Sequence, residues 1–157
     1  MRNVFIIFFV LLIFFSCKKN RVLNNYKNFS NHEWHTDSLV FFSFVIEDSL
    51  STYSLTAKVR HSGNYQYQNL FLFIYSEFSR DTIELVLAEK NGKWKGKGIG
   101  DLRELQYTFN NKKVFQKKGV YKYTFEQAMR YGSKPKITVL RDIESVGLSI
   151  LKNANKN

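Results

Sequence analysis

The sequence predicts an all-β fold, a single antiparallel β-sandwich of about eight or nine strands with a jelly-roll or Ig-like arrangement. Residues Tyr53–Arg60 alternate apolar and polar side chains without a break, which is the period of a strand buried on one face. Short apolar runs and turn signals follow one another along the chain, and helical patterns are scarce. These observations favour an antiparallel sandwich or barrel over a fold that alternates strands with helices.

The N-terminus has the pattern of a bacterial lipoprotein signal peptide, predicted to span residues 1–16. One positive charge, on Arg2, precedes twelve consecutive apolar residues, Val4–Phe15. This run has the length of the apolar region of a secretory signal and falls short of the ~20 residues that a bilayer-spanning helix needs. A small Ser16 followed at once by Cys17 resembles a loose form of the lipobox, the site at which such signals are cleaved.

Cys17 is predicted to carry acyl chains after cleavage. It is the only cysteine of the chain, and a lone thiol in an exported protein has no disulfide partner. One acyl chain binds a membrane only marginally, whereas two or more anchor stably, so we expect a protein held to the outer membrane by lipid. Lys18 and Lys19 follow the cysteine in place of the acidic residues of surface-export signals, which favours the periplasmic face.

The remaining chain is long enough for one domain. We expect residues 17–33 to comprise the lipidated cysteine and a flexible polar tether, residues 34–151 the β-sandwich domain, and residues 152–157 a polar tail. Without Arg2 the chain keeps 23 of its 24 Lys and Arg against 13 Asp and Glu, a net charge of +10. In an exported protein this charge fits lipid headgroups, polysaccharide or acidic proteins, and no nucleic-acid partner is expected.

Strands are predicted one after another from Leu39 onward. Leu39–Ile46 and Leu70–Tyr75 are apolar at nearly every position, which suits strands that are covered on both faces or placed centrally. In Tyr53–Arg60 the period of two places Tyr53, Leu55, Ala57 and Val59 on one face. The other predicted strands are Thr82–Leu87, a return strand starting at Trp94, Leu102–Phe109, Val120–Phe125 and Val146–Ile150.

Turn signals separate these strands. Asn91-Gly92 is a dipeptide preferred in two-residue type I′ hairpin turns, and Asn110-Asn111 and Lys118-Gly119 indicate further turns. Three glycines after Trp94 predict a bulge or a close backbone approach in the return strand; they are Gly96, Gly98 and Gly100.

The segment before the last strand is less regular. Phe125–Tyr131 contains good helix formers and could be a short helical turn or a strand that runs on into a loop. Gly132–Thr138 contains the only proline and is expected to be irregular.

Several short segments occur in the order and spacing of a known family. They are Asn64–Leu72, Asp81–Leu85 with Leu87-Ala88, Gly92–Gly98, Gly119–Tyr121, Gln127–Arg130 and Val146–Leu148. Together they resemble the GldH family of gliding motility lipoproteins of the Bacteroidetes, over Trp34–Ile150 and the lipoprotein signal. The resemblance implies a non-catalytic cell-envelope lipoprotein required for gliding motility and coupled to type IX secretion. Its implied partners are other envelope lipoproteins of the gliding machinery.

Enzymatic chemistry is not expected. His32 and His35 are three residues apart beside a predicted strand, where they point to opposite faces, whereas a zincin helix needs two histidines four apart. We therefore expect a solvated loop there, with neither a metal nor another cofactor. Catalysis would require both histidines and an acidic residue to meet in a cleft. The neighbouring carboxylates Glu47 and Asp48, like Asp142 and Glu144, fit turn residues better.

Four residues are candidates for binding a partner: Tyr65, Tyr67, Trp94 and Arg130. Aromatic rings in the loops of a sandwich can stack on sugars or anchor a protein, because they offer a large apolar area at low entropic cost. Alternatively, the rings fold inward and cap the ends of the sandwich. A polysaccharide- or peptidoglycan-binding module remains the second functional hypothesis, and it predicts an exposed platform of coplanar rings.

Overall fold

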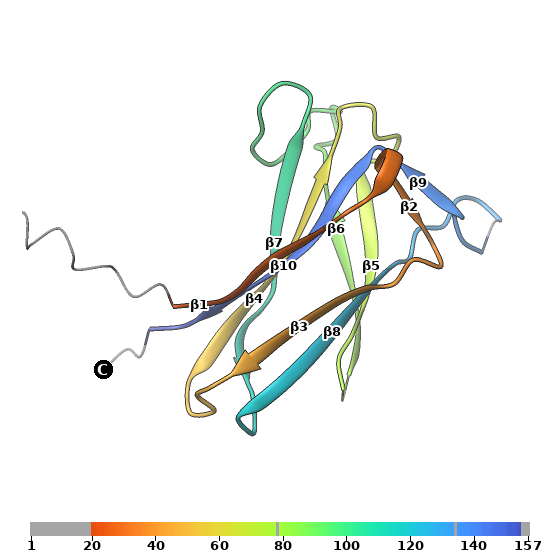
Figure 1. Cartoon of the computed structure of the whole chain (residues 1–157). Coiled ribbons are helices and arrows are strands. Elements are labelled where there is room, and N and C mark those ends of the chain that lie inside the picture. Colours follow the sequence, from red (N-terminus) through yellow and green to blue (C-terminus); the bar gives the residue numbers. More distant parts are fainter. Residues whose placement is uncertain (1–19, 78, 134, 155–157) are drawn as a thin grey trace, which may run out of the picture.

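The computed structural model describes residues 20–77, 79–133 and 135–154, so the predicted signal peptide and Cys17 lie outside the described part (Figure 1). The described chain forms ten strands and one 3₁₀ helix, η2. In order they are β1 (Arg21–Asn28), η2 (Ser30–His32), β2 (Glu33–His35), β3 (Val40–Ile46), β4 (Thr52–His61), β5 (Asn69–Tyr75), β6 (Arg80–Val86), β7 (Arg103–Val114), β8 (Gly119–Gln127), β9 (Val139–Arg141) and β10 (Ile143–Lys152). None of the described residues belongs to a helix with the length and apolar character that crossing a membrane requires.

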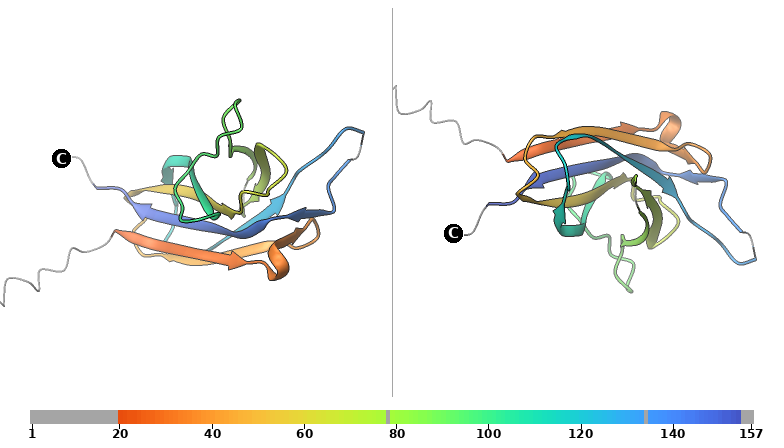
Figure 2. Two further views of the ribbon diagram at one scale, coloured as in Figure 1. Left: turned by 90° about the horizontal axis from the view of Figure 1, so that it is seen from above. Right: turned by 90° about the horizontal axis from the view of Figure 1, so that it is seen from below.

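The strands form two stacked sheets of four, ordered β1-β10-β4-β7 and β3-β8-β5-β6, with β2 and β9 paired separately (Figure 2). All described pairs are antiparallel. Among the eight sandwich strands the first pairs with the last, β1 with β10, and the same nesting continues through β3 with β8, β4 with β7 and β5 with β6. This wound hairpin is a jelly roll. The predicted all-β sandwich is confirmed, and the jelly-roll alternative is the observed one.

The core lies between the two sheets and follows the predicted strand period. Tyr53, Leu55, Ala57 and Val59 of β4 are all buried on the inner face, as expected. The opposite sheet contributes aromatic rings that meet edge to face, such as Phe42 and Phe125 at 5.1 Å between centroids. Edge-to-face contacts are favoured by the ring quadrupoles, which stabilises this arrangement of aromatic rings in the core.

The predicted tether of residues 17–33 is too long, because β1, η2 and the first residue of β2 occupy most of it. Arg21–Asn28 pairs with β10 along its length, so the sandwich begins at residue 21 rather than at residue 34. The segment lacks the alternating pattern of a strand buried on one face. Its pairing comes from backbone hydrogen bonds to an edge of the sheet, which its sequence alone does not specify. At the other end, Lys152 of the predicted tail is the last residue of β10.

Strand β3 is an edge strand with one open face, so its predicted two-sided cover is wrong. Its even-numbered residues are buried, whereas Phe41 and Val45 are exposed. The Lys122 ammonium lies 4.1 Å from the centroid of the Phe41 ring and covers part of it. Strand β5 lies between β8 and β6, in the central position that its apolar sequence predicts.

The Asn110-Asn111 signal marks an irregularity inside a strand, not a turn. Strand β7 continues through both residues to Val114, and its register with β4 shifts on each side of Leu55. A bulge and a turn both need a local change of backbone direction, so the same residues favour either. The Lys118-Gly119 turn is confirmed, since β8 begins at Gly119 after a bend.

No regular return strand starts at Trp94. The chain folds back after β6 through a single bridge between Ala88 and Trp94, and Glu89 N–H donates to Lys93 O at 2.9 Å. Within this turn only Gly92 has a positive φ, 83°. The turn is therefore a three-residue loop that ends in a left-handed glycine, and not a type I′ turn, which needs a positive φ at two residues.

The close approach predicted for the glycines is confirmed at two of them. A Cβ on Gly96 would lie 2.2 Å from Glu104 O, and a Cβ on Gly98 would lie 1.8 Å from Leu102 O. Of the two alternatives for Phe125–Tyr131, the strand is observed, because β8 runs to Gln127 and then enters a loop. The described residues of 132–138 form turns, bends and irregular backbone, as expected.

Candidate functional site

The strand registers define two ends of the sandwich. The start of β1, the end of β10, the start of β4 and the end of β7 lie together, and we call this the anchor end. Its connections are residues 47–51, 76–79 and 115–118. At the opposite, distal end lie the connections 62–68 and 87–102, above the sheets in Figure 1, and the connection 128–138, which extends to the right of the sheets there. Since β4 has ten residues, the ends are separated by roughly 30 Å.

Three of the four predicted binding residues meet at the distal end, in a row of aromatic rings. Along this row the centroid distances are 4.7 Å from Trp94 to His61, 5.7 Å from His61 to Tyr65, 5.6 Å from Tyr65 to Tyr67, and 6.4 Å from Tyr67 to Tyr131. The row joins the end of β4, the β4–β5 and β6–β7 loops, and the loop after β8. We call it the distal aromatic row.

Burial differs strongly along the row. Tyr65 is only 4% exposed, and its hydroxyl donates to Asn69 O at 3.1 Å, so this ring caps the core and is not offered to a partner. Burial raises the pKa of Tyr65, because ionisation would leave a charge in an apolar site. Tyr67 and Trp94 are half-buried, and Tyr131, which the sequence did not single out, is 67% exposed.

His61 lies fully buried inside the row. Its Nδ1 is 2.8 Å from Ser62 O, which identifies Nδ1 as the protonated nitrogen, and no described group bonds to its Nε2. Burial lowers the pKa of His61, so the ring is neutral near pH 7. A neutral imidazole between Tyr65 and Trp94 serves here as an aromatic packing residue.

The β6–β7 loop adds positive charge beside the row. It carries four exposed lysines and an apolar side chain, Ile99, that is 92% exposed. The lysines are Lys90, Lys93, Lys95 and Lys97. Backbone hydrogen bonds between Lys97 and Glu104 hold the loop against β7, and Gly63 N–H donates to the side-chain Oδ1 of Asp101 at 3.0 Å, which holds the loop against the β4–β5 loop.

Arg130 lies apart from the aromatic row, on the outer face of the second sheet. It lines a hollow of about 280 Å³ together with Phe71, Phe73, Thr82 and Ala128. Ala128 N–H donates to Phe71 O at 2.8 Å, which fixes the start of this loop on β5. Arg130 is therefore not a member of the distal aromatic row, although its sequence neighbour Tyr131 is.

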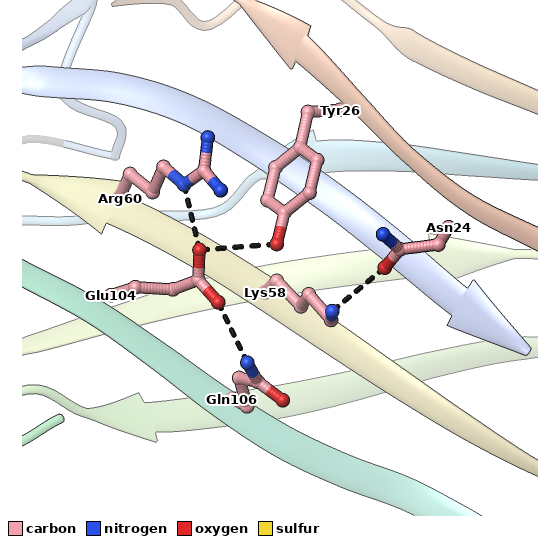
Figure 3. A network of polar contacts seen from close by, with 6 residues as sticks. All are labelled: Asn24, Tyr26, Lys58, Arg60, Glu104 and Gln106. Carbon is pink, nitrogen blue, oxygen red and sulfur yellow. Dashed lines mark hydrogen bonds and ion pairs between the residues drawn. The ribbon is translucent and has the colours of Figure 1, made fainter. Parts of the chain in front are cut away.

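A polar network crosses the outer face of the first sheet and was not predicted (Figure 3). Glu104 of β7 accepts hydrogen bonds from Arg60 Nε at 2.6 Å, from Gln106 Nε2 at 2.6 Å and from the Tyr26 hydroxyl at 3.1 Å. The Arg60 guanidinium also lies 4.1 Å from the centroid of the Tyr26 ring, a cation–π contact. Lys58 Nζ donates to Asn24 Oδ1 at 2.7 Å.

The network joins three strands across the sheet and fastens β1 to it. Tyr26 pairs with Gly147 of β10, where a Cβ would come within 2.7 Å of the tyrosine ring, so the glycine leaves room for that ring. Burial raises the pKa of the Glu104 carboxyl, but hydrogen bonds from Arg60, Gln106 and Tyr26 outweigh it and hold this pKa below its ordinary value. Lys58 and Arg60 occupy outward positions of the alternating strand β4, and this alternation could have indicated that both side chains lie on the outer face of the sheet.

The two histidines considered for metal binding are separated by their partners. His32 Nδ1 lies 2.6 Å from Glu144, and His35 Nε2 lies 3.7 Å from Glu33. In the part of the chain that the structure describes, no three His, Cys, Asp or Glu side chains form a group that could hold a metal ion.

The neighbouring carboxylates are engaged in turns. Asp48 accepts from Leu50 N–H at 2.9 Å and Ser51 Oγ at 2.8 Å, and it pairs with Lys152 at 2.6 Å. Asp142 accepts from Ser62 Oγ at 2.9 Å.

The geometry defines a small jelly-roll domain whose first strand begins four residues after the predicted lipidation site, with an aromatic and basic surface at its far end. A model of the GldH lipoprotein family matches residues 21–150. The chain belongs to the GldH lipoprotein family.

Two relatives match nearly the whole chain. It is 38% identical to the gliding motility lipoprotein GldH homolog of Christiangramia forsetii, over 98% of this chain and 97% of that protein. It is 34% identical to the gliding motility lipoprotein GldH of Flavobacterium johnsoniae, over 95% of this chain and 96% of that protein. A solved structure of infectious bursal disease virus aligns at 14% identity and a TM-score of 0.36, over 88% of this chain and 34% of that one, and this likeness carries no argument.

Proposed function

We propose that this protein is a non-catalytic lipoprotein of the outer membrane, held at the periplasmic face by acyl chains on Cys17 and required for gliding motility. The family match over residues 21–150, preceded by the lipoprotein signal, is the observation that carries this proposal. In this role the domain works with other envelope lipoproteins of the gliding machinery and with type IX secretion.

The distal end is the surface proposed to meet the protein partner. Binding energy at protein interfaces concentrates in Trp, Tyr and Arg residues, and this end offers Tyr67, Trp94, Arg130 and Tyr131. The four lysines of the β6–β7 loop would favour an acidic partner surface and speed its encounter. The distal end is also about 30 Å from the anchor end, where a partner away from the bilayer can reach it.

Polysaccharide binding stays the second candidate, and the ring geometry weighs against it. A sugar platform needs coplanar exposed rings, whereas neighbouring rings of the distal aromatic row are inclined by 60° at His61 and Trp94, 70° at Tyr65 and Tyr67, and 57° at Tyr67 and Tyr131. Inclined rings can anchor the irregular surface of a protein as well as coplanar rings can. A protein partner is therefore the better supported of the two.

Cross-linking in intact cells tests the proposal. Cells lacking the gene would be complemented with the wild-type chain, Arg130→Ala or Tyr131→Ala, and cross-linked partners would be recovered with the tagged protein. We expect both variants to reach the membrane at wild-type levels, to lose most of a cross-linked envelope protein, and to spread poorly on agar. Both side chains are exposed, so their truncation spares the core.

His32→Ala and His35→Ala are the controls, since both rings are surface-exposed and neither belongs to the distal aromatic row. We expect both to glide and cross-link normally. Inactive histidine variants together with a normal Arg130→Ala would indicate a metal or catalytic site, and would refute the proposal.

A further inference from the structure

The anchor end is basic and carries exposed apolar side chains. From Leu105 to Phe125 the chain has five lysines and no acidic residue, and four of these lysines lie in the β7–β8 connection or at the end of β7 just before it. At the same end Leu50 is 95% exposed and Val120 is 71% exposed. Apolar tips surrounded by lysines are the surface that the boundary between lipid headgroups and acyl chains accepts.

The charge at this end remains positive when the described charged residues on its strand ends and connections are counted. The cations on the strand ends and connections there are Arg21, Arg80, Lys112, Lys113, Lys117, Lys118 and Lys152, and the anions are Glu47, Asp48, Glu77 and Asp81. Seven against four leaves +3. Asp48 pairs with Lys152 at 2.6 Å, and Lys117 and Lys118 on the β7–β8 connection are both exposed.

The short segment between Cys17 and β1 limits how far the anchor end can lie from the membrane to which Cys17 is proposed to be attached. Only Lys18, Lys19 and Asn20 separate Cys17 from Arg21, a span of at most ~14 Å when fully extended. The predicted tether of residues 17–33 would have allowed the domain to move far from the bilayer, but pairing of β1 with β10 removes most of that reach. Chain start and end are held together at this end by Lys152 N–H donating to Asn20 O at 2.6 Å.

We propose that the anchor end lies directly on the membrane, with Leu50 and Val120 at the level of the headgroups and Lys112, Lys117 and Lys118 bound to anionic phosphates. The inference rests on the proposed acylation of Cys17, because the anchor supplies the proximity. Each lysine near an anionic surface contributes on the order of 1 kcal/mol to membrane attraction. The contact fixes the orientation of the domain and directs the distal aromatic row away from the bilayer.

The distal β6–β7 loop provides a control of the same chemistry. It also carries four lysines and an apolar tip, Ile99, yet it lies roughly 30 Å from the anchor end. If basic and apolar character alone decided membrane contact, both ends would bind lipid. The proposal requires that only the anchor end does so.

A labelling experiment on the mature acylated protein tests this. Cys17 is the only cysteine and is blocked by acylation, so Leu50→Cys or Ile99→Cys supplies a unique thiol for a polarity-sensitive fluorophore. Each labelled protein is reconstituted into vesicles of phosphatidylglycerol with phosphatidylcholine, and into phosphatidylcholine alone. We expect a blue shift and quenching by lipid-borne quenchers at position 50 in the anionic vesicles only, and an aqueous signal at position 99 in both.

Charge reversal separates the two ends further. Lys117→Glu with Lys118→Glu should remove most of the blue shift at position 50, and so should high salt, which screens the headgroup attraction. Lys93→Glu with Lys95→Glu, the matched pair at the distal end, should leave it unchanged.

Vesicle flotation distinguishes the two proposals. A protein that floats with the vesicles while its position 50 is as aqueous as position 99 would overturn the membrane contact and leave the lipid anchor intact. A mature protein that fails to float would overturn the anchor, and the contact that depends on it would fall as well.

Discussion

At the level of single residues, burial in this protein follows the side of the strand on which a residue lies. Leu55 and Leu72 point into the space between the two sheets and are completely buried. Val86, the last residue of β6, is exposed. The same logic fails for loop aromatics. Tyr65 and Tyr67 are two residues apart, yet one is buried and the other half-exposed, because loop geometry has no fixed period.

The first prediction concerns these core leucines. Leu55→Ala or Leu72→Ala should each lower the free energy of unfolding by about 2–5 kcal/mol, because the cavity left behind adds to the lost transfer energy. Urea unfolding followed by the fluorescence of Trp34, which is fully buried, measures the change. Val86→Ala is the matched control and should cost less than about 1 kcal/mol. A leucine variant that unfolds like the wild type would contradict the assigned facing of its strand.

At the level of elements, β1 is the strand whose attachment needs explanation. It is an edge strand with few apolar side chains, and the Tyr26 contacts to Glu104, Arg60 and Gly147 hold it across the sheet. Its attachment matters beyond stability, because it decides how far the domain can move from Cys17.

The second prediction is a pH dependence that originates in this network. The pKa of Glu104 is lowered in the folded protein, so its stabilising effect is present above the ordinary carboxyl value of 4.5 and is lost as pH falls through the folded pKa. Glu104→Gln removes the charge. The difference in unfolding free energy between wild type and Glu104→Gln should be about 1 kcal/mol near pH 7, limited by solvent screening, and should shrink as pH falls below 4.5 toward the folded pKa of Glu104.

The comparison uses urea titrations of both proteins at several pH values. Other carboxylates titrate in both proteins and cancel in the difference, so the remaining slope belongs to Glu104. A difference that stays constant from pH 7 to pH 3 would show that the Glu104 charge does not stabilise the network.

At the level of the whole molecule, a basic, apolar end lies where the described chain enters the sandwich, nearest in sequence to the predicted lipidation site, and an aromatic, basic end lies opposite it. The two ends have similar compositions, and their proposed roles differ because the chain enters the sandwich at one of them. A jelly roll suits this division, since its connections gather at two opposite ends of the sheets.

The third prediction is that Cys17→Ala prevents acylation, leaving the protein uncleaved or free in the envelope. Partitioning into a detergent phase should fall from nearly complete to the level of a soluble protein, because no acyl chain remains to hold it. Ser16→Gly keeps a small residue before the cysteine and should partition like the wild type. Equal partitioning of Cys17→Ala and the wild type would refute the lipoprotein assignment.

The sequence by itself determined the class of fold, most strand positions and the inner face of β4, because a period of two in side-chain polarity is a local property of a strand. It also determined the family, through segments such as Asn64–Leu72 and Gly92–Gly98. Likewise, it indicated where the backbone must come close, at Gly96 and Gly98, since only glycine fits there.

Only the tertiary structure decided which strand lies at an edge, that β1 exists, and which aromatic rings reach the surface. The outer face of β3 and the polar sequence of β1 depend on neighbours that are distant in the chain, and pairing with β10 supplies backbone bonds that no local pattern encodes. The distal aromatic row is likewise assembled from β4 and three loops, so its members are neighbours in space and not in sequence.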